Sequence, residues 1–487
     1  MSENNLCQKF INRIFLNFKK SNNIFYKNNR EKYSYKETFE KICKLMNFIQ
    51  SNKTERVVVF SDKSPNYYLT VISIIFVGKT WIQISPNIPL ARIKKIIKIS
   101  KCKFGFYDES FNNSKIISKL KINLFRPEEV YSSSFKKKIT SINKINPNKT
   151  AMIFFTSGST SDPKGVAISY KSFIYSAFQQ IKNLNYKKNN EIFSDYHDSS
   201  FVMSLNIIFP AMYLSACISP ITDYYDKINP IDHIKRNKVS VLITVPSFFL
   251  YINNFIKKKI NIKKIIFCGE SFSLNILKLC INKIKFNNLY NCYGATELSP
   301  WVYFYKYSKK HDSIINRYNQ VPIGKPFEST IHKINNKNEL CISGPALSKG
   351  YLIKSQNKNR FFKIKNKRYY NTGDVCEKFS KNILFILGRN DKQIKLKGYR
   401  INLLEIENVV KKIPKIEFVM CFKKTKKEKL VLLVVSKIKN IENKITDYLL
   451  NNLPSYMFPS EIFVKKKVKL NKNGKVDRNF YVKSFDK

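Results

Sequence analysis

Short apolar runs alternate with helical stretches over most of the chain, and this alternation constrains the fold more than any other feature. Residues 56–60 (RVVVF) have the composition of a buried strand, residues 66–77 the pattern of a helix, and residues 81–84 that of the next strand. The order strand, helix, strand predicts a mostly parallel sheet covered by helices. We therefore expect an α/β fold.

The pattern continues after the polar, turn-rich segment 143–149, which we take as a subdomain boundary. We expect a second α/β block there, with strands near 151–155, 239–245 and 264–268. From about residue 321 to 387, Gly, Pro and Asn break short strands such as 339–343 and 383–387. Such a stretch is typical of a small β-rich subdomain.

The length of 487 residues exceeds one typical folding unit, so we expect at least two domains. A basic segment of alternating helix and strand patterns follows Gly388. We predict a large domain over residues 1–387 and a small, mobile α+β domain over residues 388–487.

The net charge of +54 is large enough to suggest nucleic acid or an acidic surface as a partner. The lysines, however, are spread along the chain and form no arrayed basic face. Lys, Asn, Ile, Phe and Tyr are residues of A+T-rich codons, so we favour coding bias on solvated faces and expect no specific nucleic acid partner. A basic nucleic-acid-binding protein stays open as an alternative.

The ten cysteines contain no C-x-x-C pair, and the four histidines lie far apart, so we expect free, mostly buried thiols. The N-terminal residues are polar, and the longest apolar run, about 67–77, is too short to span a bilayer. We expect a buried helix at that run, no membrane partner and a cytoplasmic location.

The most informative local feature is residues 151–166, AMIFFTSGSTSDPKGV. An apolar strand runs into a loop of small and hydroxylated residues, followed by Lys164 and Gly165. Backbone N–H groups of small residues can approach an anion closely, hydroxyls add donors and a lysine adds charge. The loop suits a triphosphate, although it is no Walker loop and a solvated turn is an equal alternative.

Four more segments could contain functional residues, although each of them alone could simply be a turn. Residues 290–299 (YNCYGATELS) join an aromatic ring, a turn glycine and a carboxylate, which would suit base stacking and Mg²⁺. Residues 369–374 (YYNTGD) place a carboxylate after a glycine, where it could accept both ribose hydroxyls. Residues 388–407 span the expected domain junction, and residues 470–478 present Lys475.

Taken together and in this order, the five segments resemble the motif series of the adenylate-forming (AMP-binding) enzyme superfamily. Residues 78–92, Gly269–Glu270 and 324–351 match that series as well. The stretches QIKLKGYRINLLEIE, LPSYMFPS and LNKNGKVDR look most like D-alanine:carrier-protein ligases and stand-alone nonribosomal peptide synthetase adenylation domains.

The resemblance implies a role for each matching residue, with ATP and Mg²⁺ as the nucleotide and metal. Lys475, Glu297 and Lys164 would be catalytic, Glu297 would bind Mg²⁺, and Asp391 would be the hinge. Tyr293 would stack near the adenine, and Asp374 and Arg389 would hold the ribose. The full nucleotide-binding set is Thr156, Ser157, Gly158, Ser159, Thr160, Lys164, Gly269, Glu270, Asn291, Tyr293, Gly294, Thr296, Asp374 and Arg389.

Three positions depart from the series. Ser161 stands where glycine is usual, and Asn371 replaces the usual arginine. Val202 falls where the amino-acid-activating branch has the aspartate that pairs with the substrate ammonium, which a valine cannot do. By the same alignment the acyl pocket is lined by Val202, Met203, Thr244, Cys268, Cys292 and Trp301.

The expected reaction is adenylation of a small carboxylic acid, followed by transfer to a thiol, with the phosphopantetheine of a separate carrier protein as the predicted acceptor. Val202 favours an aryl, hydroxy or short acyl acid, although Asp198 could still meet an ammonium. A ligase that uses free coenzyme A and a degenerate carrier-protein-binding scaffold are the alternatives.

Overall fold

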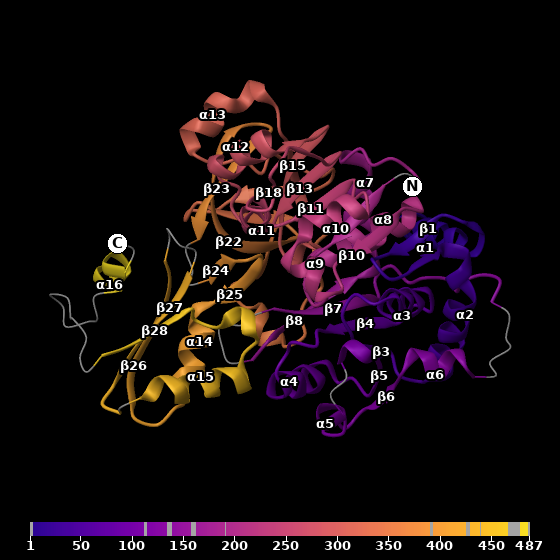
Figure 1. Ribbon diagram of the computed structural model, residues 1–487, viewed down its shortest axis with the longest axis horizontal. Coiled ribbons are helices and arrows are strands. Elements are labelled where there is room, and N and C mark those ends of the chain that lie inside the picture. Colours follow the sequence, from indigo (N-terminus) through magenta and orange to yellow (C-terminus); the bar gives the residue numbers. More distant parts are fainter. Residues whose placement is uncertain are drawn as a thin grey trace. The chain divides into compact units, whose positions relative to one another are not determined.

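The computed structural model describes residues 3–111, 114–133, 139–156, 162–189, 191–389, 393–424, 429–438, 440–465 and 478–485 (Figure 1). The chain divides into two compact units. Unit 1 comprises Met1–Pro86, Ser100–Phe154 and Gly165–Asn390, and unit 2 comprises Asn87–Ile99, Phe155–Lys164 and Asp391–Lys487. The expected α/β class is confirmed, and we describe each unit by itself.

A seven-stranded sheet contains the first predicted β-α-β unit. Its order is β20 (Gly350–Tyr351), β8 (Lys164–Ser169), β7 (Thr150–Thr156), β4 (Thr80–Ile84), β3 (Arg56–Phe60), β5 (Phe104–Tyr107) and β6 (Asn123–Phe125). Strand β3 pairs in parallel with β4 and β5. Helix α3 (Pro65–Phe76), capped by Ser64, connects β3 to β4 and is buried from Tyr67 onward, as its apolar sequence predicts.

A nine-stranded sheet lies in the same unit. Its order is β17 (Lys325–Pro326), β16 (Trp301–Lys306), β15 (Asn288–Gly294), β13 (Lys264–Cys268), β11 (Val241–Thr244), β9 (Ile192–Asp195), β10 (Cys217–Pro220), β1 (Ile24–Lys27) and β2 (Lys32–Ser34). The strands from β15 to β1 are parallel, and β16, β17 and β2 are antiparallel. Helices α1 (Glu3–Lys20), α2 (Tyr35–Ser51), α7 (Tyr170–Asn183) and α8 (Leu205–Leu214) contribute buried side chains to a hydrophobic core shared with strands of both sheets.

The predicted boundary at residues 143–149 does not separate the two sheets. Strand β7, which follows it, pairs with β4 of the first sheet rather than with β11 and β13. Conversely, β1 from the N-terminal region pairs with β10 of the second sheet. The prediction of sheet membership was wrong because parallel pairing depends on crossover connections, which strand periodicity does not encode.

The β-rich stretch forms a five-stranded antiparallel sheet. Strands β18 (Ile331–Ile334), β19 (Glu339–Ser343), β22 (Lys367–Ser380) and β21 (Phe361–Ile364) follow one another, and β23 (Ile383–Arg389) pairs with β22. The register of β22 and β23 places Asp374 opposite Arg389. This pairing brings together two residues that are fifteen positions apart in the sequence.

Unit 2 has its own core. Strands β26 (Ile416–Lys424), β27 (Lys429–Ser436) and β28 (Glu461–Lys465) form a sheet, and β24 (Gln393–Leu396) pairs with β25 (Tyr399–Asn402). Helices α14 (Leu403–Val410) and α15 (Ile441–Asn452) pack on the face that carries Val419 and Cys421. The opposite face, with Met420 and Phe422, contacts Tyr481 of α16 (Arg478–Phe485).

Unit 2 also includes α4 (Leu90–Ser100) from the N-terminal half of the sequence up to Ile99. Within this unit, Arg92 of α4 donates to Glu405 of α14 at 2.6 Å, and both side chains are buried. The electrostatic attraction of Glu405 raises the pKa of Arg92 against the opposing effect of burial. A buried ion pair therefore joins two segments that are far apart in the sequence.

The remaining elements are short. They are α5 (Ser114–Ile117), α6 (Pro127–Tyr131), α9 (Tyr224–Ile228), α10 (Pro230–Arg236), α11 (Pro246–Asn253), α12 (Leu274–Lys283), α13 (Asp312–Tyr318), β12 (Ile260–Asn261), β14 (Ile284–Lys285) and the 3-10 turns η1 (Glu109–Phe111), η2 (Val202–Ser204), η3 (Thr296–Leu298), η4 (Lys309–His311), η5 (Lys354–Asn357) and η6 (Ser455–Met457). None of the ten cysteines, all of which lie in the described part of the chain, forms a disulfide, and all but the half-buried Cys43 are buried, as expected. Among the described residues, no helix combines the length and apolarity needed to cross a bilayer.

Candidate active site

The carboxyl ends of adjacent parallel strands in the nine-stranded sheet carry many of the predicted site residues. Strand β11 ends at Thr244, β13 ends at Cys268 and β15 ends at Gly294. Open α/β sheets bind ligands outside this edge, because the loops that follow each strand converge there. Thr244, Cys268 and Gly294 therefore lie along one edge of this sheet, whereas Asp374 and Arg389 belong to the five-stranded sheet and Thr156 and Lys164 to the seven-stranded sheet.

Asp374 is the best-defined predicted residue. Its Oδ1 accepts a hydrogen bond from Arg389, its Oδ2 accepts one from the Tyr293 hydroxyl at 2.5 Å, and the residue is 4% exposed. Thr372 completes the arrangement, because its Oγ1 accepts from the Asp374 N–H at 3.0 Å and its carbonyl accepts from Arg389 at 2.9 Å. The structure thus brings together three residues that were predicted from separate segments.

The environment of Tyr293 determines that Tyr293, rather than Asp374, donates the hydrogen bond between them. Burial, followed by the nearby Asp374 carboxylate, raises the pKa of the Tyr293 hydroxyl, so it stays protonated and donates to Asp374. The carboxylate is held in one orientation by this donor and by a guanidinium. Each carboxylate oxygen can still accept a further hydrogen bond, as a pair of vicinal hydroxyls would require.

Glu297 lies in η3, directly after β15, and is 1% exposed. Its Oε1 accepts a hydrogen bond from the Tyr351 hydroxyl at 2.5 Å, and its backbone carbonyl accepts from the Ser348 N–H at 2.9 Å. Tyr351 was part of a matching segment but had no predicted role, since its contact with Glu297 spans 54 positions in the sequence.

A carboxylate oxygen fits Mg²⁺, which proteins commonly bind through one or two carboxylates together with substrate phosphates. No group of three or more His, Cys, Asp or Glu residues that could hold a metal occurs in the described part of the chain. The donor set at Glu297 therefore fits a metal that is bound jointly with a phosphate, rather than a cage built by the protein alone.

Gly269 and Glu270 follow β13. Gly269 has a φ of +84°, a left-handed conformation that glycine adopts without strain, and the chain turns there. Both oxygens of Glu270 accept hydrogen bonds from Ser247, one from its N–H at 2.9 Å and one from its Oγ at 3.0 Å. Ser247, which sequence reasoning missed, thus fixes Glu270 against the start of α11.

The other predicted residues around β15 have structural contacts. Asn291 donates through Nδ2 to the carbonyls of Val321 and Pro322, and Thr296 is buried in η3. Gly294 packs so closely that an added Cβ would lie 1.8 Å from the Pro300 carbonyl oxygen. Only glycine therefore fits where β15 turns toward Glu297.

Two of the predicted acyl-pocket residues, Cys268 and Met203, are in contact through their sulfur atoms. The Cys268 thiol lies 3.0 Å from the Met203 sulfur and 3.7 Å from the Thr244 carbonyl oxygen. Cys292 is the register partner of Cys268 on the neighbouring strand, and burial raises the pKa of its thiol, which stays neutral. The five hydrophobic residues of this set belong to one buried cluster: Val202, Met203, Cys268, Cys292 and Trp301.

Asp198, the candidate that could replace the missing aspartate, accepts three hydrogen bonds from serine residues. Its Oδ2 accepts from Ser85 Oγ at 2.8 Å, and its Oδ1 accepts from the N–H and the Oγ of Ser200. These contacts hold the loop between β9 and η2. Three donors hold this carboxylate, and Oδ2, which has one of them, can accept a further hydrogen bond.

Several predicted residues lie outside the described residues. These are Ser157, Gly158, Ser159 and Thr160 of the phosphate loop, the departure Ser161, the hinge Asp391 and the catalytic Lys475. Thr156 is the last residue of β7, and the buried Lys164 is the first residue of β8.

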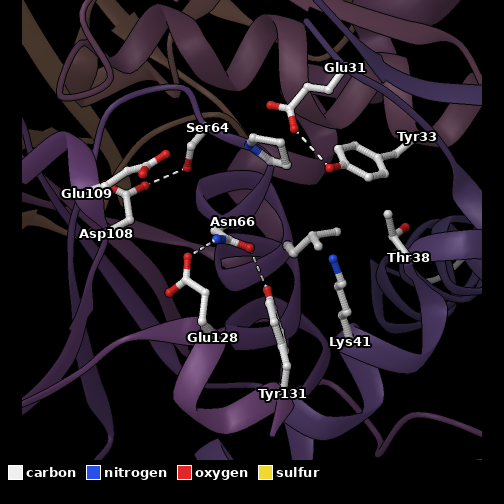
Figure 2. A pocket seen from close by; sticks show the side chains of 12 residues that line it. Glu31, Tyr33, Thr38, Lys41, Ser64, Asn66, Asp108, Glu109, Glu128 and Tyr131 are labelled. Atoms are coloured by element: carbon white, nitrogen blue, oxygen red, sulfur yellow. Dashed lines mark hydrogen bonds between the residues drawn. The ribbon is translucent and has the colours of Figure 1, made fainter.

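A cavity of about 160 Å³ lies elsewhere, in the region of α2, α3 and α6 (Figure 2). Its polar side chains largely bind one another: Tyr33 donates to Glu31, Asn66 donates to Glu128 and Tyr131 donates to Asn66. None of the predicted site residues lines it. The cavity is therefore separate from the candidate site.

Comparison with known proteins gives a family match over residues 8–352 to the AMP-binding enzymes. The D-alanine–D-alanyl carrier protein ligase of Staphylococcus aureus (strain Newman) is 27% identical over 465 residues, which cover 92% of this chain and 93% of that protein.

Solved structures share the fold. The Vibrio cholerae adenylation domain AlmE, in complex with glycyl-adenosine-5'-phosphate, superposes with a TM-score of 0.85 at 19% identity and 98% coverage of both chains. The o-succinylbenzoate CoA synthetase of Bacillus subtilis gives 0.82 at 18% identity, covering 97% of this chain and 98% of that one.

Proposed function

The chain belongs to the family of AMP-binding enzymes and is an adenylate-forming ligase, and from this premise we propose that it activates a small carboxylic acid as its acyl-AMP and transfers the acyl group to a carrier-protein thiol. The observation that carries the nucleotide part is the Asp374 carboxylate, held by Arg389 and Tyr293. Such a fixed, buried acceptor suits a ribose diol.

In the first half-reaction, a carboxylate oxygen of the acid attacks the α-phosphorus of ATP, and the bond to pyrophosphate breaks. Lys475 neutralises the charge that grows on the α-phosphate, and Lys164 with the loop Thr156–Lys164 holds the leaving phosphates. Glu297 would hold Mg²⁺ together with the phosphates, and the metal would supply further charge stabilisation. Electrostatic stabilisation of this kind is commonly the largest catalytic contribution, with one donor worth about 10²–10³ in rate.

In the second half-reaction, a thiol attacks the acyl carbonyl and AMP leaves. We assign the thiol to a carrier protein, in keeping with the D-alanyl carrier protein named for the Staphylococcus aureus relative. A structure similar in fold to this chain, an artificially fused adenylation–carrier di-domain from Klebsiella oxytoca, has a TM-score of 0.79 at 18% identity, covering 93% of each chain. The small domain from residue 388 onward would turn about Asp391 between the two half-reactions.

The acid is not an ordinary α-amino acid bound through an aspartate. Val202 is buried among apolar and sulfur-containing side chains, and the carboxylate of Asp198 is occupied by Ser85 and Ser200. An ammonium beside Val202 would find no anion at that position, and a buried charge without an anion is costly. We therefore favour an aryl, hydroxy or short acyl acid.

The test is carboxylate-dependent exchange of pyrophosphate into ATP across a panel of amino, aryl, hydroxy and short-chain acids. We expect Lys475→Ala to abolish exchange while leaving transfer from supplied acyl-AMP to the thiol largely intact, since Lys475 acts only while charge builds on the phosphate. Lys465→Ala, an exposed lysine at the end of β28, is the control and should change neither half-reaction.

Equal loss of both half-reactions in Lys475→Ala would contradict the role of that lysine. Exchange with no acid would instead favour the degenerate carrier-binding scaffold. Free coenzyme A accepting the acyl group faster than a phosphopantetheine-loaded carrier would favour the second candidate function, an acyl-CoA or aryl-CoA ligase.

A further inference from the structure

Helices α9 and α11 of unit 1 carry an unusual concentration of exposed apolar side chains. Eleven large hydrophobic residues are exposed in the described part of the chain, and four of them lie between residues 224 and 251. A group of this kind marks an interaction site, whereas single exposed residues are ordinary. The four are Tyr224 at 78% exposure, Tyr225 at 56%, Ile228 at 45% and Tyr251 at 41%.

Contacts between the two helices make these side chains one continuous surface. The Tyr251 hydroxyl donates to the Ile228 carbonyl at 2.8 Å, so α11 lies against the end of α9. Tyr224 and Ile228 are four positions apart on α9 and share one side of it. The Tyr251 ring also packs edge-on against Phe255, with ring centroids 5.2 Å apart. We call this surface the α9–α11 patch and define it as Tyr224, Tyr225, Ile228, Tyr251 and Phe255.

The charge that the patch region offers to a partner is positive. Its carboxylates are bound within the protein: Asp226 is buried and paired with Arg236. Asp232 accepts a hydrogen bond from the Tyr225 hydroxyl at 2.8 Å, and Asp223 caps α9. Six exposed lysines, in contrast, lie on α9 and α10 or shortly after these helices and α11, so an acidic partner surface is favoured. They are Lys227, Lys235, Lys238, Lys257, Lys258 and Lys259.

Helix α11 connects the patch to the candidate site. It begins directly after Val245, next to the end of β11 at Thr244, and Ser247 in its first turn binds Glu270. Tyr251 follows Ser247 by about one helical turn, a rise of about 6 Å along the axis. A partner bound to the patch is therefore held beside the sheet edge that carries predicted site residues.

We propose, resting on the carrier-protein transfer proposed above, that the α9–α11 patch docks the carrier protein, and that the docking face of this carrier has an apolar centre and an acidic rim. The thiol of the second half-reaction must arrive at the candidate site, so its carrier needs a surface next to that site. Exposed tyrosines with cations around them suit such a contact, because aromatic anchors supply much of the affinity and rim charges steer the encounter.

A second copy of this chain fits the patch less well. In a symmetric dimer the same surface faces itself, so the six lysines of one copy would meet those of the other, and like charges that face each other are costly. The C-terminal part of this chain is itself basic and meets the same repulsion. The charge of the patch region therefore selects an acidic partner over either of these occupants.

The experiment measures acyl transfer to two acceptors, using the acid that supports pyrophosphate exchange. One acceptor is the phosphopantetheine-loaded D-alanyl carrier protein of Staphylococcus aureus, and the other is free phosphopantetheine, which has the thiol but no protein surface. The double variant Tyr224→Ser, Ile228→Ser should raise the KM for the carrier about tenfold or more, because it removes interface anchors. Pyrophosphate exchange and transfer to free phosphopantetheine should keep their wild-type rates. Leu16→Ser, an exposed leucine of α1, is the matched control.

A second double variant tests the charge. Lys257→Glu, Lys258→Glu should also raise the KM for the carrier about tenfold, and the wild-type KM should rise with salt concentration, since salt screens the attraction. Lys309→Glu, Lys310→Glu changes the charge equally at the exposed turn η4 and should leave this KM unchanged. Thermal melts establish that every variant is folded.

A carrier KM that is unchanged in both double variants, or transfer to free phosphopantetheine but not to the carrier, would overturn the inference and leave the adenylation reaction in place. Exchange that falls together with carrier transfer would assign the patch to adenylation and overturn the inference as well. Exchange with no acid at all would overturn the proposed function, and with it the inference.

Two further measurements examine other occupants of the patch. Sedimentation velocity could show a dimer that Tyr224→Ser, Ile228→Ser dissociates, which would assign the patch to a second copy. Vesicles of phosphatidylglycerol could bind the wild type but not this variant, which would assign the patch to a membrane surface. Either result, with an unchanged carrier KM, would overturn the inference.

Discussion

At the scale of single residues, Asp374 shows how one carboxylate is prepared for a ligand. Its two oxygens have different partners, a guanidinium and a phenol, and its N–H is held by Thr372. Loss of a charge-assisted acceptor costs about 1.5–3 kcal/mol, which corresponds to a factor of about 10–100 in affinity.

Asp374→Ala should therefore weaken ATP binding by about 10–100-fold, measured by calorimetry with the intact chain. Glu377→Ala is the control, because Glu377 is an exposed carboxylate of the same strand whose partner is Tyr318. ATP affinity that is unchanged in Asp374→Ala would remove the ribose assignment.

Asp195 gives a prediction that depends on pH. It ends β9, it is 1% exposed, and burial raises its pKa from 3.8 to about 6 despite the opposing charge of Lys63. Because the pKa of Asp195 is higher in the folded state than in the unfolded state, the protonated carboxyl favours the folded state. This contribution to the free energy of unfolding is fully present below pH 3.8 and is lost as the pH rises through about 6.

Asp195→Asn, which is always neutral, should escape that loss. Its oxygen can still accept from Tyr68, so the difference in free energy of unfolding between variant and wild type should grow by up to about 3 kcal/mol from pH 4 to pH 7. Urea denaturation at several pH values measures it, with the exposed Asp447→Asn as control. A difference that stays constant over this range would show that the Asp195 carboxyl is not perturbed.

Some site residues could be found from the sequence and others could not. Glu297, Asp374 and Arg389 stand in recognisable segments, but Tyr351 and Ser247 enter through contacts that no local pattern records. The Tyr351 hydroxyl, for example, reaches Glu297 across 54 positions. Whether a buried atom such as Thr244 Oγ1 has a partner depends on packing, which the sequence does not state.

At the scale of elements, strand positions were predictable and strand partners were not. The runs at β3, β13 and β19 matched the structure, because alternation and β-branched residues are local properties. The pairing of β7 with β4, and of β1 with β10, depends on long connections between the strands. The order of strands in both sheets therefore had to come from the structure.

The link between α4 and α14 is an element-scale feature with a clear energetic consequence. Glu405→Gln should destabilise the protein by about 3–5 kcal/mol, because it leaves the Arg92 guanidinium buried without a counter-charge. Chemical denaturation of the full chain measures this change. The exposed pair Lys182–Glu328 is the control, and Glu328→Gln should lower the free energy of unfolding much less, because solvent screens an exposed pair.

The double variant Arg92→Met, Glu405→Leu should recover most of the lost stability, because apolar side chains of similar volume replace both charges. If the double variant were as unstable as the sum of the separate changes Arg92→Met and Glu405→Leu, the ion pair would not be the source of the effect.

At the scale of the whole molecule, we predict that limited proteolysis cuts near residues 388–391, where the sequence pattern changes and the hinge is assigned. The division between the compact units falls at Asn390 and Asp391. Mass spectrometry of the fragments checks the position. A chain that resists cleavage there and yields no C-terminal piece would count against the hinge.

Such a cut would not yield two self-sufficient proteins. Unit 2 is assembled from three stretches of the sequence, and two of them, Asn87–Ile99 and Phe155–Lys164, precede most of unit 1. A gene fragment that ends at Asn390 would encode Arg92 but not Glu405, its buried counter-charge. Recombination between related genes could therefore not freely exchange this C-terminal region. An incoming segment must supply a partner for Arg92, which the host gene encodes 313 positions before Glu405.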